Sequence, residues 1–266
     1  MDDTEGINDV EDKLENAFQT ITSVVLGTKL CGYRNYEKWL TRNVTNNEYG
    51  ESLMSGKRIY LPPFDFYRDT KHNILTIEEA YGTQGKRQLT NEELEKLTFS
   101  NAKTMLKKLA TTTPNTQYGE NSNLIDCDFY YSSHFSYRCV ALVKSKYCFY
   151  CFWPRQSIYS IGCFYTFSSQ FCIKCYNSEN LNRCFEMSDC SNCTDSMFCH
   201  NCENLNDCMF CFNVKSKRYA IANVEVGREG YLRIKQIVLG DIAKKLERNK
   251  ELEFGVFNIG CHRRSN

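Results

Sequence analysis

The cysteines in the second half of the chain are the residues whose type and spacing could do chemistry. From Cys190 to Cys211 the sequence reads CSNCTDSMFCHNCENLNDCMFC, which is three CxxC pairs separated by five residues each. Two such pairs could bind one zinc ion tetrahedrally through four thiolates. The candidate metal ligands are therefore the six cysteines of this stretch: Cys190, Cys193, Cys199, Cys202, Cys208 and Cys211.

The spacing of the whole cysteine set favours a packed core over a metal site. Fourteen of the 16 cysteines, from Cys127 to Cys211, fall on one grid of every third residue, and a nine-residue unit lies on that grid. Leu181 and Met187 stand at grid positions equivalent to cysteines. Neither can replace a thiolate on zinc, whereas a solenoid core accepts any compact inward side chain. We expect a core without a cofactor, and zinc bound by the thiols of 172–211 is the alternative.

The repeat predicts a mainly β chain, namely a cysteine-lined β-solenoid (β-helix). Residues off the grid in the later units are mainly Asn, Asp and Ser, which suit the corners of a tightly turning coil. We expect each coil to consist of either two or three of the nine-residue units. A period of three also fits stacked 3₁₀ or polyproline turns, although long runs of either are uncommon.

Helical patterns flank the solenoid on both sides. Residues 1–115 form a mixed, mostly helical region, in which apolar residues recur at helical spacing from Ile7 to Val25. A turn-rich run at 111–123 marks the boundary to the solenoid of residues 116–220. Residues 221–266 then form a strand–helix cap, with helical spacing from Tyr231 to Leu246.

The end of the repeat also carries a recognisable pattern. Asn213, Lys217, Tyr219, Ile221 and Asn223 follow the last CxxC pairs, and Glu229 and Tyr231 then begin an acidic-aromatic helix. In this, residues 125–250 resemble a cysteine-rich repeat family found in candidate-phylum bacteria, archaea and viruses. The resemblance implies the solenoid fold and carries no activity with it.

Aromatic residues crowd the early part of the repeat. Of the fifteen between Phe129 and Phe171, only Tyr130 lies on the grid, so the others are expected at the surface of the coils. A surface that apolar should be covered by the N-terminal helical region, by a second copy or by another protein. Stacking on single-stranded nucleic acid is a further alternative, for which the net charge of +1 gives no support. The candidate partner-binding residues are Phe149, Tyr150, Phe152, Trp153, Phe164 and Tyr165.

Catalytic signals are weak throughout. The chain contains no GxSxG, P-loop, HExxH or GxGxxG motif. Few cations lie near the CxxC pairs to lower a thiol pKa for redox chemistry. The acidic N-terminus has no apolar signal core, and no apolar run is long enough to span a membrane. We therefore expect a non-enzymatic scaffold in the cytoplasm or another reducing compartment, which mediates protein assembly as part of a larger viral or cellular structure.

Overall fold

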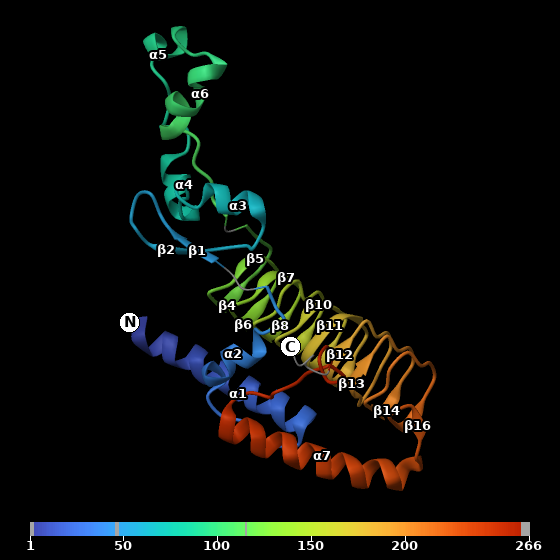
Figure 1. The fold of residues 1–266 in the computed structure, drawn as a ribbon. Coiled ribbons are helices and arrows are strands. Elements are labelled where there is room, and N and C mark those ends of the chain that lie inside the picture. Colours follow the sequence, from blue (N-terminus) through green and yellow to red (C-terminus); the bar gives the residue numbers. More distant parts are fainter. Residues whose placement is uncertain (1–2, 46–47, 115, 262–266) are drawn as a thin grey trace. The chain divides into compact units, whose positions relative to one another are not determined.

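The computed structural model describes residues 3–45, 48–114 and 116–261, which form two compact units (Figure 1). The first unit comprises Met1–Thr45 and Tyr118–Asn266, and the second comprises Asn46–Gln117. The end of the second unit lies close to the boundary expected near residue 115. The first 45 residues belong with the solenoid instead of with the region that follows them, because their helix packs on the coils.

The first unit is a β-solenoid with helices beside it. Its helical elements are α1 (Asp3–Leu26), η1 (Tyr33–Tyr36), α2 (Glu37–Leu40) and α7 (Gly227–Asn249). β3 (Gln117–Tyr118) pairs with β5 (Asp128–Tyr131) at the start of the solenoid. The other early strands are β4 (Ser122–Ile125), β6 (His134–Tyr137), β7 (Val140–Val143), β8 (Lys146–Phe149), β9 (Ile158–Ile161) and β10 (Phe164–Phe167). The later strands are β11 (Gln170–Glu179), β12 (Asn182–Ser188), β13 (Met197–His200), β14 (Asn206–Met209), β15 (Arg218–Ile221) and β16 (Val224–Glu225).

Each coil of the solenoid consists of four triplets. The parallel strand pairs all join a residue to its equivalent four triplets later, for example Leu124 to Ser136 and Cys172 to Cys184. About 9 turns stack in this way, and the predicted cysteine-lined β-solenoid is confirmed. The expected coil lengths of two or three nine-residue units are wrong. One coil is four triplets, or twelve residues. A step of nine residues is therefore three triplets, one triplet less than a full coil.

A left-handed backbone conformation at every third residue turns the chain. From Asn123 to Ala222 the residue just before each grid position has a φ of 45–57°, with Gly162 at 62°. Asn, Asp and Gly tolerate this region best, and the later coils place Asn or Asp there at many positions, for example Asn192 and Asn204. Bulky residues such as Trp153 also adopt it in the early coils. The grid residues therefore point inward while the chain turns between them.

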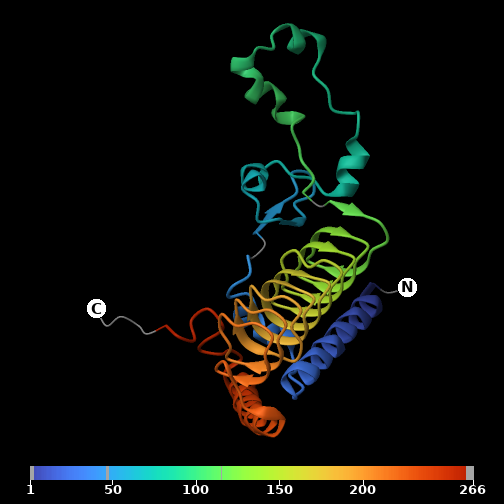
Figure 2. The ribbon, with the colours of Figure 1, turned by 90° about the vertical axis from the view of Figure 1, so that its right-hand side faces the viewer.

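The helices cover one apolar strip of the solenoid. The strip takes one residue from each coil, immediately after a grid position: Ile125, Tyr137, Phe149, Ile161, Ile173, Phe185, Met197, Met209 and Ile221. Leu14, Phe18, Ile21 and Val25 of α1 are buried against this strip. Tyr231, Ile242 and Leu246 of α7 join the same core, so the helical spacing predicted for both helices is confirmed. Figures 1 and 2 show α1 running beside the stack of coils.

The second unit is small and built from short elements. A β-hairpin of β1 (Glu48–Glu51) and β2 (Arg58–Leu61) is followed by α3 (Asp65–Thr70), α4 (Ile77–Thr83), α5 (Asn91–Glu95), α6 (Phe99–Met105) and η2 (Leu106–Lys108). Ile59, Leu61 and Ile74 form its buried cluster. Capping boxes begin α4 at Thr76 with Glu79 and α5 at Thr90 with Glu93.

Candidate functional site

The thiols of the repeat lie inside the solenoid. All fourteen cysteines from Cys127 to Cys211 are buried free thiols, and none of them forms a disulfide. Cys31 and Cys261 are also free but are exposed. The grid falls into four inward columns, because each coil contributes four triplets. One column consists of Cys127, Cys139, Cys151, Cys163, Cys175, Met187, Cys199 and Cys211.

Most of these thiols also satisfy backbone groups between coils. The Cys163 thiol donates to the carbonyl of Ile161 at 3.4 Å and lies 3.6 Å from the carbonyl of Cys172, in the next unit of the repeat. Its sulfur accepts the N–H of Cys175, one full coil later, at 3.5 Å. This pattern explains the sequence preference, because the position needs a compact group that both donates and accepts. Hydrogen bonds from a thiol to a carbonyl also run along the nine-residue spacing, as from Cys163 to Cys172.

At other grid positions a serine hydroxyl donates and accepts the equivalent hydrogen bonds. The Ser145 hydroxyl donates to the carbonyl of Val143 at 2.9 Å and accepts the N–H of Ser157 at 3.2 Å. Since buried backbone groups are costly to leave unpaired, Cys and Ser both occupy grid positions for a shared reason. Leu181 and Leu205 fill grid positions by volume alone.

Burial keeps thiols in the middle of the solenoid protonated. Desolvation raises the pKa of Cys163 and of Cys139 well above the ordinary thiol value. The thiolate is the nucleophile and the metal ligand, so these two groups are in the inert form. Burial of this kind is typical of structural cysteines.

The six candidate metal ligands are spread over all four columns. Cys190 and Cys202 share one column and Cys199 and Cys211 another, while Cys193 and Cys208 each lie in a further column. The Cys190 thiol donates to the carbonyl of Ser188 at 3.1 Å. Hydrogen bonds with Cys193 and Cys202 raise the pKa of Cys190, and the same contacts lower the pKa of Cys193 and of Cys202. Within the described ranges, no group of three or more His, Cys, Asp or Glu residues is arranged to hold a metal ion.

Two of the six candidate aromatic residues are covered by the helical elements of the first unit. Phe149 and Tyr150 are buried. The Phe149 ring lies 6.4 Å from Phe18 of α1 and 5.3 Å from Tyr33 of η1, between ring centroids. The N-terminal residues therefore provide the cover for this part of the aromatic segment, which was one of the three expected covers.

The other four form a second aromatic group, called here the aromatic surface: Phe152, Trp153, Phe164 and Tyr165. Phe152 stacks on Phe164 at 5.0 Å, and Trp153 stacks on Tyr165 at 5.3 Å, because the members of each pair occupy equivalent positions on successive coils. Trp153, Phe164 and Tyr165 are partly exposed, and the Arg155 guanidinium lies 5.0 Å from the Trp153 ring. Each stack joins one face of a ring to the ring one coil away, and Phe152 is itself buried, at 5% exposure.

Sequence reasoning missed a buried ion pair that joins the solenoid to the segments beside it. Lys174 and Glu186 occupy equivalent positions on successive coils, their Nζ and Oε1 atoms are 3.8 Å apart, and their side chains are 2% and 0% exposed. Lys174 Nζ donates to the carbonyl of Trp39 at 2.9 Å, and Glu186 Oε2 accepts the N–H of Val256 at 2.9 Å. Opposite charges twelve residues apart are the sequence signal for this pair, and recognising it requires the coil length.

Desolvation moves both members of this pair toward their neutral forms. It raises the pKa of Glu186 and lowers the pKa of Lys174, and each charge partly opposes the shift of the other. Gly255 is required beside the pair, since a Cβ there would lie 2.7 Å from Glu186 Oε2. The pair thus holds α2 and the segment after α7 against the coils.

Comparisons with known proteins assign no family to the chain. No protein-family model matches the chain, and no curated protein matches it. Among the described residues, no helix has the length and apolar character needed to cross a membrane.

Proposed function

We propose that the protein is a non-enzymatic scaffold whose aromatic surface binds a protein partner. The observation that carries the proposal is the pair of ring stacks, Phe152 on Phe164 and Trp153 on Tyr165, held on successive coils. Aromatic side chains are enriched at the centres of protein interfaces. Here they project from a backbone that adjacent coils hold by hydrogen bonds, for example from Tyr165 N–H to the Phe152 carbonyl at 2.9 Å.

A surface whose side chains are already held in place favours binding, because those side chains lose little conformational entropy when a partner binds. Immobilising a flexible side chain at an interface costs about 0.5–1.5 kcal/mol. The stacked rings are already restricted before any partner binds. Most of their conformational entropy is therefore lost when the chain folds and not when the partner binds. A solenoid also keeps the spacing between binding residues fixed, which is what a scaffold requires.

The ring geometry supports a protein partner over single-stranded nucleic acid. A base stacks on the face of an aromatic ring, whereas Phe152 and Phe164 turn their faces toward each other. Ring edges and the nearby Arg155 suit apolar and carbonyl groups of a protein surface. Nucleic acid therefore remains the less favoured partner.

Site-specific photo-crosslinking tests the proposal. We would place benzoylphenylalanine at Tyr165 in one variant and at Asn192 in a matched variant, expressed in the native host. Both positions have a left-handed backbone, with φ of 55° and 50°. We expect a discrete protein product from position 165 and none from position 192. A product between two copies of the chain would identify a homo-oligomer as the partner.

Binding of the identified partner should then depend on the rings. Trp153→Asn with Tyr165→Asn removes them and leaves a residue type that suits the left-handed backbone. We expect partner affinity to fall by roughly 30-fold or more, as for interface hot spots worth about 2 kcal/mol. Equal labelling at positions 165 and 192, or unchanged affinity in the double variant, would refute the proposed surface.

We also propose that the thiol columns serve as core and bind no metal. Titration with a thiol reagent should detect only Cys31 and Cys261 in the native chain, and all 16 cysteines after unfolding. Elemental analysis of the same reduced sample should find no stoichiometric metal. Zinc at one or more ions per chain, with protected thiols released by a chelator, would favour the metal-binding alternative.

A further inference from the structure

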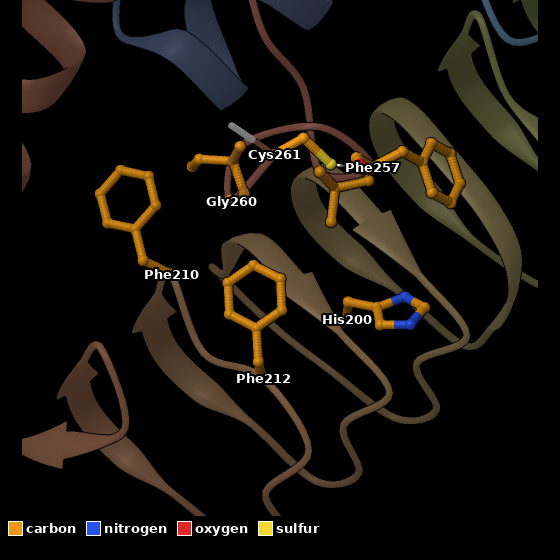
Figure 3. Close-up of a pocket in the computed structure, with 8 residues that line it drawn as sticks. His200, Phe210, Phe212, Phe257, Gly260 and Cys261 are labelled. Atoms are coloured by element: carbon orange, nitrogen blue, oxygen red, sulfur yellow. Dashed lines mark hydrogen bonds between the residues drawn. The ribbon is translucent and has the colours of Figure 1, made fainter. Parts of the chain in front are cut away.

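We propose that the pocket beside the last coils, shown in Figure 3, binds a neutral aromatic small molecule that carries one hydrogen-bonding group. The pocket has a volume of about 520 Å³, within the range of roughly 300–1,000 Å³ that ligand sites occupy. It lies between the coils that carry His200 and Phe212 and the segment Val256–Cys261. None of its residues belongs to the aromatic surface.

The lining is mainly apolar and aromatic. Its residues are His200, Phe210, Phe212, Val256, Phe257, Ile259, Gly260 and Cys261. Phe210 and Phe212 line it from the coils, and Phe257 lines it from the segment after α7. A flat ring compound matches such walls better than a branched or strongly polar ligand, because aromatic rings pack on one another in offset and edge-on geometries.

His200 supplies the polar contact of the pocket. Its Nδ1 lies 3.6 Å from Asp189 Oδ2, a residue of the same solenoid face. That distance is too long for a hydrogen bond, and among the described residues Nδ1 is buried without a hydrogen-bond partner. A nitrogen of the His200 ring can therefore accept or donate one hydrogen bond to a ligand, according to the tautomer. Among the described residues, no Lys, Arg, Asp or Glu lines the pocket, so the lining favours a neutral ligand over a charged one.

The outer wall of the pocket is anchored to the core. The N–H of Val256 donates to the buried Glu186, and the N–H of Gly255 donates to Asn258 Oδ1 at 2.7 Å. Ile259 N–H donates to the Gly255 carbonyl at 3.1 Å, which closes the turn. A wall fixed in this way keeps the space open without a ligand, as preformed binding sites require.

Gly260 lines the pocket and offers a position at which a side chain can be added. A Cβ built on Gly260 meets no atom within 4 Å, so Gly260→Leu places its side chain in open space. Gly82 in α4 of the second unit has an equally free Cβ, and Gly82→Leu is therefore the matched control. Cys261 at the pocket and Cys31 far along the chain are both exposed thiols, which gives an internal reference for occupancy.

The test uses 4-phenylphenol as the probe, with the full chain. We expect saturable binding by calorimetry and slower alkylation of Cys261, but not of Cys31, as the probe is added. Gly260→Leu should weaken binding at least 10-fold, and Gly82→Leu should leave it unchanged. Biphenyl-4-carboxylate should bind less tightly than 4-phenylphenol.

The role of His200 is tested by pairing a variant with a probe. One neutral hydrogen bond is worth about 0.5–1.5 kcal/mol, or roughly 2- to 13-fold in affinity. His200→Phe should therefore weaken 4-phenylphenol binding by that factor and leave the binding of biphenyl unchanged. Absence of saturable binding, equal binding by Gly260→Leu, or equal protection of Cys31 and Cys261 would overturn the proposed site. Equal losses for both probes in His200→Phe would overturn the assigned polar contact.

Discussion

Breaking the buried pair of Lys174 and Glu186 should reveal strong coupling between them. At the observed Nζ–Oε1 separation of 3.8 Å, and with an effective dielectric constant of about 20, Coulomb's law gives about 4 kcal/mol of attraction. Glu186→Gln removes the charge and keeps an oxygen for the N–H of Val256. We expect it to lower the free energy of unfolding by about 3–5 kcal/mol, because Lys174 is left buried without its counter-charge.

The double variant separates the pair interaction from the burial of each group. Lys174→Met alone should cost a similar amount, since it leaves Glu186 unpaired and the Trp39 carbonyl without its donor. Lys174→Met with Glu186→Gln removes both charges, and we expect it to be no less stable than either single variant.

Urea unfolding followed by tryptophan fluorescence measures these differences. The chain has two tryptophans, Trp39 and Trp153, so a Trp153→Phe background leaves Trp39 as the only reporter. Trp39 is buried beside the Lys174 ammonium, 5.7 Å from its ring centroid. If the two single costs added within about 0.5 kcal/mol in the double variant, the sites would be independent and the reasoning would be refuted.

Three further variants probe the coil and the second unit. Asn204→Val places a β-branched residue at a φ of 54° and should lower the free energy of unfolding by about 1–2 kcal/mol. Asn206→Val on β14, at a position that is also exposed, should change it by no more than about 0.5 kcal/mol in the same urea assay. Equal losses in the two variants would contradict the assignment of Asn204 to a left-handed corner. Cys163→Ser keeps a donor and an acceptor, but Cys163→Ala leaves the N–H of Cys175 unpaired, so Ala should be the costlier change by about 1–3 kcal/mol; a costlier Ser would show that sulfur volume dominates. In the second unit, the hydroxyl of Ser52 and the N–H of Thr76 lower the pKa of Glu79 to about 2. Because the folded pKa is depressed, its stabilisation is present above the unfolded pKa and is lost as the pH falls toward 2. Glu79→Gln should therefore flatten the pH dependence of amide exchange in α4 below about pH 4.5, and an unchanged profile would assign that dependence to other groups.

The sequence predicted the identity of the inward residues but not the coil length. A period of three appears because every third side chain, such as Cys163 or Ser145, must be compact and must satisfy its backbone neighbours. That requirement is local and is the same for any whole number of triplets per coil. The nine-residue column of Cys190, Cys199 and Cys208 suggested coils of two or three such units. In the structure these residues lie in three different columns, and the thiols of Cys190 and Cys199 reach the carbonyl one unit later.

A signal for the true coil length was present in the chain. Taking one residue from every fourth triplet, from Ile125 to Ile221, gives an unbroken apolar strip, in which Phe149 and Phe185 are fully buried under the helices. The strip can be recognised as a buried surface only if α1 is known to pack on it. The sequence shows that α1 has an apolar face but does not show which surface that face contacts. The candidate aromatic residues divide for the same reason: Phe149 belongs to the strip, and Trp153, a little further along the same coil, lies on another face.

The amino-acid sequence by itself determined the repeat, the inward grid of cysteines and serines, and the helical character of the segments at both ends of the solenoid. These features follow from side-chain volume, hydrogen-bonding capacity and apolar periodicity, all of which act over a short stretch of chain. Only the tertiary structure decided that four triplets close a coil, that Lys174 and Glu186 meet, and that the Val256–Cys261 segment forms a pocket with His200. Each of these depends on which residues the stacking register brings together across the chain, and a local pattern leaves that register open.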